Sequence, residues 1–210
     1  MSEARLSEAQ IADAGLADWR LLYHALQTRF RTRNFAAGLQ LLNAVGAAAE
    51  EANHHPDLDL RYGHLNIRLY SHDAMGVTER DLALARRISA LAAEQGVTAE
   101  PLAVSALEVA LDTPDHARIK PFWQAVLGYA DNPEADDELR DDNADLPRIW
   151  FQASGAEEPR QRFHLDIAVP KDIAQERIDA AVAAGGRVID TADTFVVLAD
   201  PDGNKVCVCS

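Results

Sequence analysis

The chain has 210 residues, of which 48% are hydrophobic, and it carries a formal net charge of −14. This acidic surplus argues against binding to nucleic acid, because that binding is driven by attraction between phosphates and basic groups. No run approaches the ~20 apolar residues of a membrane span, and the N-terminus lacks the apolar stretch of a secretory signal, so we expect a cytoplasmic protein with no membrane partner.

The first predicted elements are two short strands and a helix. Residues 19–32 mix aromatic and β-branched side chains with polar ones, a composition typical of strands. Asn34 is a suitable N-cap for a helix that runs to about Asn53. Apolar side chains recur at helical spacing and predict its apolar stripe: Phe35, Leu39 and Leu42.

Two strand segments and a second helix are predicted next. The apolar positions of the two segments alternate with polar ones: Leu58, Leu60, Tyr62, Leu65, Ile67 and Leu69. The alternation changes parity across Gly63, which predicts a bulge or a bend there. Thr78 is expected to cap the second helix, whose apolar face is Leu84, Ile88, Leu91 and Ala92. This order of elements predicts an α+β fold with an antiparallel sheet.

A domain boundary is expected near residues 95–101, where Gly96 and Pro101 follow a helical pattern and indicate a helix end with a short linker. We therefore expect one domain at residues 1–97 and another at residues 104–210. The charge is uneven across this point, since residues 1–98 hold 10 basic and 12 acidic side chains and residues 99–210 hold 10 and 22. The difference fits two units with different surfaces, and the extra acid also favours solubility.

The second half contains one arrangement twice: a strand, a helix and further strands. Residues 107–111 and 163–169 are the two leading strands, and Glu108 and His164 occupy matching places in them. Further strands are expected at residues 148–153, 195–199 and 205–209. The helix stripes are Arg118, Phe122, Ala125 and Val126 in the first copy and Ala174, Ile178, Ala181 and Val182 in the second. The acid-rich residues 131–145 are expected to form a solvated loop.

The two cysteines, Cys207 and Cys209, lie two residues apart in the last predicted strand. A strand places such residues on one face, about 6.6 Å apart, which is near the upper limit for a disulfide. We expect both thiols to be reduced, as in a reducing compartment.

Three histidines lie at predicted element ends in the first half. His54 and His55 precede Pro56, which disfavours helical geometry in the residue before it and turns the chain out of its helix. His72 follows a strand, between Ser71 and Asp73. Such positions are where reactive side chains can reach a ligand.

Other roles for these histidines stay open on chemistry alone. They could be surface or capping residues, and three histidines could hold zinc, although adjacent histidines seldom converge on one ion. Glu50 lies four residues before His54, so the two side chains can share a helix face.

The run from Glu50 to Pro56 resembles the E-x-x-x-H-H-P signature of the pterin-4a-carbinolamine dehydratases. The resemblance continues through Tyr62, the strand at 65–69, Ser71–His72 and residues 76–81, and it covers roughly residues 4–95. It implies a four-stranded antiparallel sheet with helices on one face, in a homo-oligomer. The implied activity is loss of water from 4a-hydroxytetrahydropterin, giving the quinonoid dihydropterin, with no metal or other cofactor required.

The resemblance also implies roles for individual residues. We expect His54 and His72 to transfer protons and His55 to position the substrate or share that task, because imidazole can act as acid or base near neutral pH. Asp81 is expected to orient the site, and Glu50 to hold the pterin or pair with a histidine. Ser71 and Asp73 complete the expected binding or orienting group. Two departures from the family pattern are Leu58, where many relatives have Trp, and Ser71, where many have Thr.

Residues 104–210 resemble the glyoxalase, or vicinal-oxygen-chelate, superfamily. The segments that carry the resemblance are 108–111, 122–129, 164–169 and the turn sequence at 200–204. The superfamily pairs two βαβββ modules and often binds one divalent metal. The matching ligand positions are Glu108, Gln152, His164 and Cys207, a mixed set, so a metal is possible here but is not expected.

Two alternatives to a dehydratase stay open. The glyoxalase-like half could be the working enzyme, as a metal-dependent lyase, isomerase or dioxygenase. The first half could instead be a non-catalytic dimerisation or regulatory partner, a role that relatives in animals have.

Overall fold

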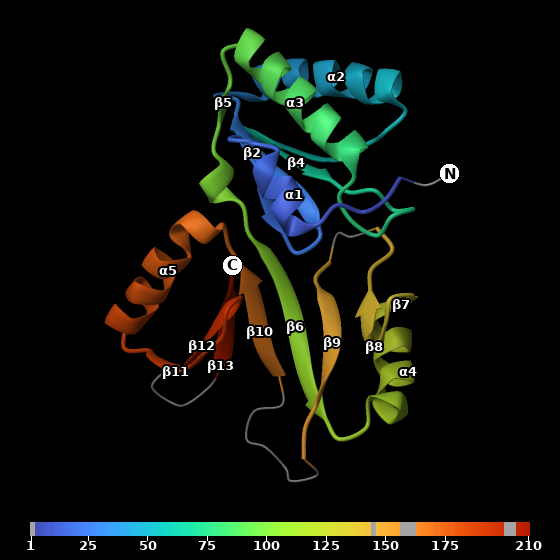
Figure 1. Cartoon of the computed structure of the whole chain (residues 1–210), viewed down its shortest axis with the longest axis vertical. Helices are drawn as coiled ribbons and strands as arrows, with labels where there is room; N and C mark the ends of the chain where they lie inside the picture. The colour runs from blue at the N-terminus through green and yellow to red at the C-terminus, as the bar shows by residue number, and fades with distance from the viewer. Residues whose placement is uncertain (1–2, 144–145, 156–162, 200–204) are drawn as a thin grey trace. The chain divides into compact units, whose positions relative to one another are not determined.

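The computed structural model describes residues 3–143, 146–155, 163–199 and 205–210. The chain divides into two compact units, Met1–Val104 and Ser105–Ser210 (Figure 1). Within the described residues, no helix combines the length and the apolar character that crossing a membrane requires.

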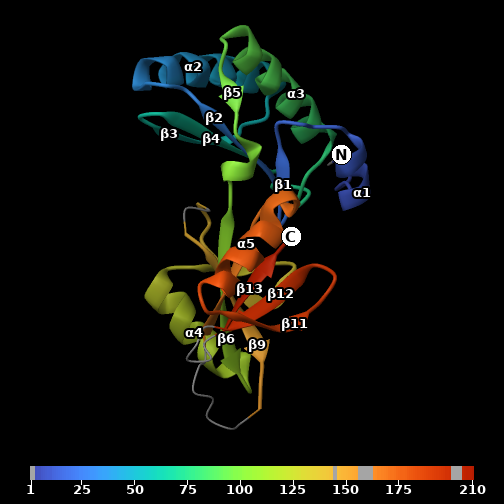
Figure 2. The same ribbon diagram turned by 90° about the vertical axis from the view of Figure 1, so that its left-hand side faces the viewer.

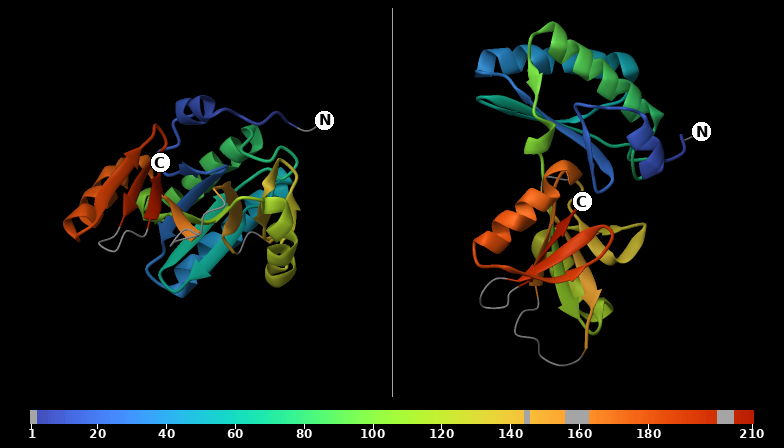
Figure 3. Two further views of the ribbon diagram at one scale, coloured as in Figure 1. Left: turned by 90° about the horizontal axis from the view of Figure 1, so that it is seen from below. Right: turned by 60° about the vertical axis from the view of Figure 1, so that its left-hand side comes forward.

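The first unit is a sheet with helices on one face. Its elements are α1 (Glu8–Asp13), β1 (Arg20–Leu22), β2 (Ala25–Arg31), α2 (Phe35–Ala52), β3 (Asp57–Arg61), β4 (His64–Leu69), α3 (Glu79–Glu94), β5 (Thr98–Ala99) and the 3-10 turn η1 (Pro101–Ala103). The strands lie in the order β1-β2-β4-β3, all antiparallel, and β5 also pairs with β2. Helices α2 and α3 cover the same face of this sheet (Figure 3). The α+β fold with an antiparallel sheet is confirmed.

Helix α2 begins and ends where the sequence predicts, but it buries a different face. The Asn34 side chain accepts a hydrogen bond from the Ala37 N–H, and Asn53 ends the helix. Phe35 and Leu39 are 49% and 43% exposed. The buried positions are Gly38, Leu41, Val45, Ala48 and Ala49. The predicted stripe was therefore wrong for Phe35 and Leu39, whereas Leu42 packs against the core.

Glycine at position 38 explains this rotation of the helix. A Cβ there would lie 2.5 Å from Leu60 Cδ1 and 3.1 Å from Thr32 Oγ1. The absence of a side chain lets the helix backbone approach the sheet closely, so this face turns inward in place of the larger apolar residues.

Helix α3 follows its prediction closely. Thr78 is its N-cap, in a capping box with Asp81. The predicted apolar face is buried: Leu84, Ile88, Leu91 and Ala92. Across the core, the Trp19 indole N–H donates to Ser89 Oγ at 3.1 Å.

Two connections differ from the sequence predictions. The parity change at Gly63 is a hairpin turn, because Arg61 of β3 pairs directly with His64 of β4. Residues 98–99, expected in a linker, form β5 and pair with Arg31 and Phe30. The Glu100 N–H also donates to the Arg29 carbonyl at 2.6 Å, so this segment belongs to the first unit.

The second unit consists of two βαβββ modules. The first contains β6 (Ala106–Thr113), α4 (His116–Leu127), β7 (Ala130–Asn132), β8 (Ala135–Arg140) and β9 (Arg148–Ala153). The second contains β10 (Phe163–Ala168), α5 (Lys171–Ala183), β11 (Arg187–Thr191), β12 (Phe195–Ala199) and β13 (Lys205–Cys209). One sheet joins them, in the order β11-β12-β13-β10-β6-β9-β8-β7. The predicted paired modules are thus confirmed.

Some details of this unit differ from prediction or lie beyond the described residues. The acid-rich stretch includes the hairpin β7–β8, because Leu139 is fully buried and anchors it. Ala174 and Ile178 of α5 are buried as expected, whereas Val182 is 42% exposed. The side chains of Phe122, Ala125 and Val126 and the turn at 200–204 lie outside the described residues.

The two faces of the second sheet differ in chemistry because strand side chains alternate. Apolar residues such as Leu111, Phe151 and Val208 pack beneath α4 and α5, and α5 lies against β11 and β13 (Figure 2). Polar residues of β6, β9, β10 and β13 point to the opposite face: Glu108, Asp112, Arg148, Trp150, His164, Asp166 and Cys207.

Candidate active site

The first group of candidate residues lies where α2 ends. Asn53 adopts a left-handed conformation with φ 47° and ψ 41°, which reverses the chain and lets the His54 N–H donate to the Ala49 carbonyl at 3.1 Å. His54 is only 7% exposed. The turn predicted from the proline thus directs His54 inward.

Asp81 is the centre of a buried hydrogen-bond network. Its Oδ1 lies 2.7 Å from His54 Nε2. Its Oδ2 accepts from Ser71 Oγ and from the Thr78 N–H, each at 2.7 Å, and from Thr78 Oγ1 at 3.2 Å. Asp81 is 0% exposed, so these contacts compensate for its burial. The capping box of α3 therefore also fixes the orientation of a histidine.

Glu50 pairs with His55, not with His54. Glu50 Oε1 lies 3.1 Å from His55 Nε2, and both side chains are exposed. The shared helix face expected for Glu50 and His54 is absent because the chain reverses at Asn53.

His72 lies in the loop between β4 and α3. Ser71 and Gly76 close this loop through a short antiparallel bridge. The His72 ring is exposed and contacts the Tyr70 ring edge-on, with the centroids 5.0 Å apart. Since Ser71 binds Asp81, and Asp81 binds His54, one network of contacts holds the His72 loop against the turn that carries His54.

Asp73 and Arg80 form an ion pair beside this network. The Arg80 guanidinium donates to Asp73 Oδ1 and also lies 3.5 Å from Glu3 Oε2. This hydrogen bond holds the pKa of Asp73 below its ordinary value and raises the pKa of Arg80. Both groups therefore stay charged at neutral pH.

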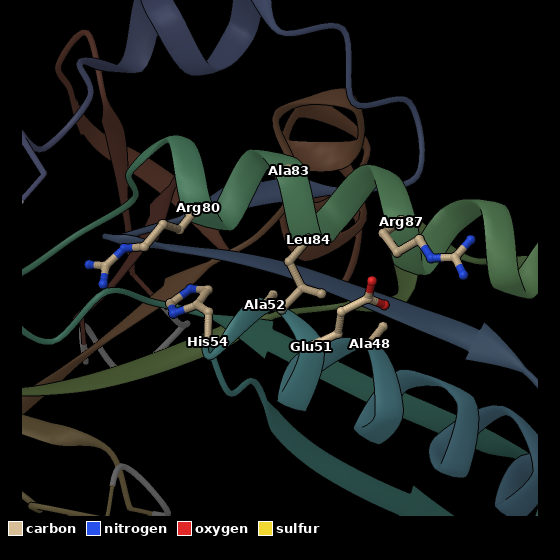
Figure 4. Close-up of a pocket in the computed structure, with 8 residues that line it drawn as sticks. All are labelled: Ala48, Glu51, Ala52, His54, Arg80, Ala83, Leu84 and Arg87. Atoms are coloured by element: carbon tan, nitrogen blue, oxygen red, sulfur yellow. The ribbon is translucent and has the colours of Figure 1, made fainter.

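A cleft between α2 and α3 reaches His54 (Figure 4). Its volume is about 390 Å³, within the range of about 300–1,000 Å³ of small-molecule sites. Its lining combines apolar side chains with charged ones of both signs: Ala48, Ala52, Ala83, Leu84, Arg80, Arg87 and Glu51. Sequence reasoning did not identify either arginine, although both lie on one face of α3, seven residues apart.

A second polar cluster lies in the second unit. It contains His164, Asp166 and Cys207. A ring nitrogen, a carboxylate oxygen and the thiol sulfur of these residues lie within 4.8 Å of one another. The Trp150 indole N–H donates to Asp166 Oδ2 at 2.8 Å. Burial, together with a hydrogen bond to Asp166, raises the pKa of the Cys207 thiol to about 12. Both cysteines are free thiols.

The two other positions expected in a second-domain pocket, Glu108 and Gln152, have different surroundings. Glu108 Oε1 lies 3.3 Å from Arg148 Nε, and burial raises the pKa of Glu108 to about 7. Gln152 is exposed near the end of β9. Of the four expected positions, His164 and Cys207 belong to the cluster with Asp166. Asp166 was missed, although its position two residues after His164 in a strand places both on one face.

Comparisons with known proteins agree with this division of the chain. Residues 4–91 match the family model of pterin 4 alpha carbinolamine dehydratase, and residues 108–209 match that of the glyoxalase-like domain. A Chloroflexus aurantiacus protein named as a pterin-4-alpha-carbinolamine dehydratase is 45% identical over 86 residues, covering 40% of this chain and 92% of the relative. A Thermomicrobium roseum protein with the same name is 41% identical over 91 residues, covering 42% and 98%.

A solved structure is also similar to the first unit. It is described as a transcriptional coactivator/pterin dehydratase from Brucella melitensis, with 28% identity, a TM-score of 0.41, and coverage of 42% of this chain and 98% of that chain. The family model and the curated relatives decide the assignment: through residues 4–91 the chain belongs to the pterin-4a-carbinolamine dehydratase family, and a glyoxalase-like domain follows.

Proposed function

We propose that the first unit removes water from 4a-hydroxytetrahydropterin and gives the quinonoid dihydropterin, which a reductase can then recycle. The observation that carries the proposal is the contact of 2.7 Å between His54 and the fully buried Asp81. Membership of the dehydratase family supplies the substrate class.

The reaction needs one proton acceptor and one proton donor. The substrate loses the proton on N5, and the hydroxyl group on C4a gains a proton and leaves as water, so the N5–C4a bond becomes double. The protein gains one proton and supplies one, and no redox partner is needed. A positioned acid or base contributes about 10²–10⁴-fold to such a step.

His54 is suited to proton transfer because its tautomer is fixed. A carboxylate only accepts hydrogen bonds, so the contact with Asp81 assigns a proton to His54 Nε2. Nδ1 then carries the lone pair that can take up a proton. Ser71 and Thr78 hold the other carboxylate oxygen, which keeps the ring in one orientation.

His72 is the proposed partner of His54 in proton transfer. Its ring is exposed, so it can approach a bound substrate, and its contact with Tyr70 limits its rotation. The ion pair between Asp73 and Arg80 steadies the same loop. We assign His55, paired with Glu50 at the surface, to positioning of the substrate.

The proposal is tested by following the decay of 4a-hydroxytetrahydropterin in a stopped-flow spectrometer. We expect His54→Ala and His72→Ala each to lower kcat by at least tenfold, as loss of a proton-transfer group does. The matched control is His24→Ala, a change at an exposed histidine that contacts Arg5. Chelators should leave the rate unchanged. The assignment would be contradicted if His54→Ala and His72→Ala were as fast as the control His24→Ala.

A further inference from the structure

The segment before α1 contacts the loop that carries His72. We propose that residues 3–7, here called the strap, hold this loop where His72 can reach the substrate, and that Arg5 is the positioning residue of the strap. The inference rests on the proposed dehydration, because it concerns the placement of one of its proton-transfer groups.

The strap runs beside the closed end of the loop (Figure 1). At that end, the Ser71 N–H donates to the Gly76 carbonyl at 2.9 Å, and the Gly76 N–H donates to the Ser71 carbonyl at 3.3 Å. The carbonyl of the next residue, Val77, accepts a hydrogen bond from the Leu6 N–H at 2.8 Å. The strap therefore adds a backbone contact directly beside the bridge that closes the loop.

Gly76 leaves the space in which the Arg5 side chain lies. A Cβ at position 76 would be 2.8 Å from Arg5 Cδ and 3.0 Å from Arg5 Cγ. Carbon atoms in favourable contact are about 3.5–4.0 Å apart, so the side chain lies directly on the backbone of the loop. Gly76 is not among the glycines with positive φ. The close approach of Arg5, and not the backbone conformation, is thus what requires glycine here.

The loop needs support at this end because its backbone is strained. Met75 has φ 50°, in the left-handed region that residues with a Cβ rarely adopt. Such strain persists only where surrounding contacts hold it, and it is frequent at functional sites. The strap contacts Gly76 and Val77, the two residues that follow Met75. It therefore stabilises the strained end of the loop, whereas Ser71 holds the other end through Asp81.

Contacts on both sides of Arg5 fix the strap itself. On one side, Glu3 Oε2 accepts a hydrogen bond from the Arg80 N–H at 3.2 Å, in the first turn of α3. On the other side, Ser7 is the N-cap of α1, and Ile11 of that helix is buried in the core. Arg5 is thus held between two anchors, and its side chain is kept over the loop.

The stem of Arg5, rather than its charge, covers the loop. The atoms nearest to the space above Gly76 are Cγ, Cδ and Nε. The guanidinium end extends beyond them and contacts His24 Nδ1 at 2.8 Å, so the proposal gives His24 no part in positioning. A lysine has a stem of similar length that can cover the same surface, whereas an alanine has none. Arg5→Lys should therefore hold the loop, and Arg5→Ala should release it.

The effect is measured on the full-length protein by the decay of 4a-hydroxytetrahydropterin. A misplacement of about 1 Å can cost about 100-fold, so partial release of the loop in Arg5→Ala should lower kcat by about three- to tenfold. KM should change little, and Arg5→Lys, the matched control, should have a kcat near that of the wild type. Gly76→Ala, whose methyl group would displace the Arg5 stem, should cause a loss like that of Arg5→Ala.

A double-mutant cycle separates positioning of His72 from a general effect on stability. If Arg5 acts through His72, adding Arg5→Ala to His72→Ala should change kcat by less than about twofold. Hydrogen exchange should be faster at residues 71–76 in Arg5→Ala but not in Arg5→Lys. Urea unfolding checks that each variant is folded in the assay.

Three results would overturn the inference: wild-type kcat in Arg5→Ala, an equal loss in Arg5→Lys, or the full loss repeated in the His72→Ala background. Failure of the proposed function is a separate outcome, in which the wild-type protein gives no acceleration. In that case hydrogen exchange still decides whether the strap holds the loop, and unchanged exchange at residues 71–76 in Arg5→Ala would refute it.

Discussion

Replacing Asp81 with asparagine tests how the capping box controls His54. The amide has the size of the carboxylate but can accept through one atom only. If its oxygen faces Ser71 and Thr78, which both donate to Asp81 Oδ2, its NH₂ group faces His54 Nε2 and donates to it. The imidazole must then carry its proton on Nδ1, where the reaction needs the lone pair.

The expected loss follows from this change of tautomer. Because a positioned base contributes about 10²–10⁴-fold, kcat of Asp81→Asn should fall by at least 100-fold while KM changes little. Exchanging hydrogen bonds to a buried charged group for weaker ones should also cost about 1–3 kcal/mol of unfolding free energy. Stopped-flow decay of 4a-hydroxytetrahydropterin measures the first effect, and urea unfolding measures the second.

Glu79→Gln is the matched control, since Glu79 is an exposed acid in the same first helical turn. It should leave both kcat and stability near wild type. A folded Asp81→Asn protein with wild-type kcat would refute the idea that Asp81 sets the tautomer of His54.

Three further predictions concern the surface pair, the domain boundary and the second unit. His55→Ala should lower kcat by less than tenfold and act mainly on KM, because His55 pairs with Glu50 at the surface; a loss as large as that of His54→Ala would contradict this. A fragment of residues 1–104 should fold alone and be more stable than residues 1–97 by about 1–3 kcal/mol in urea unfolding, because only the longer one keeps β5 and its hydrogen bonds to β2; equal midpoints would contradict this. Burial raises the pKa of Glu108 from 4.5 to about 7, so the folded protein binds this proton more tightly than the unfolded chain does. The stability that results is fully present below about pH 4.5 and is lost as the pH rises through 7. The lost stability is about 3 kcal/mol. Thermal unfolding of Glu108→Gln should therefore show a flatter pH dependence than that of the wild-type protein, and identical profiles would oppose the burial argument.

Local signals in the sequence predicted the element ends well. Asn34 and Thr78 are the N-caps of α2 and α3, and their side chains act over three residues, a distance that sequence spacing describes directly. The repeated βαβββ order was also visible, because each module is continuous in the chain.

Long-range packing was not predictable in the same way. The inward face of α2 depends on Leu60 and Thr32, which touch Gly38 only in the folded chain. Glu50 pairs with His55 because Asn53 adopts a left-handed conformation, which the spacing to His54 does not reveal.

The candidate sites, too, could be predicted only in part from the sequence. Asp81 was identified as an orienting residue, but its four contacts come from three separate segments of the chain. Asp166 was missed because the matching positions of the two modules pointed to Glu108 and His164. In the folded sheet, the register pairs Glu108 with Asp166 instead.

The most direct test of the proposed function compares the wild-type chain with His54→Ala/His72→Ala. Freshly generated 4a-hydroxytetrahydropterin is mixed with each folded protein, and its decay is compared with the rate in buffer alone. The proposal predicts strong acceleration by the wild type and a rate for the double variant at least 100-fold lower. Full activity in the double variant, or no acceleration by the wild type, would contradict it.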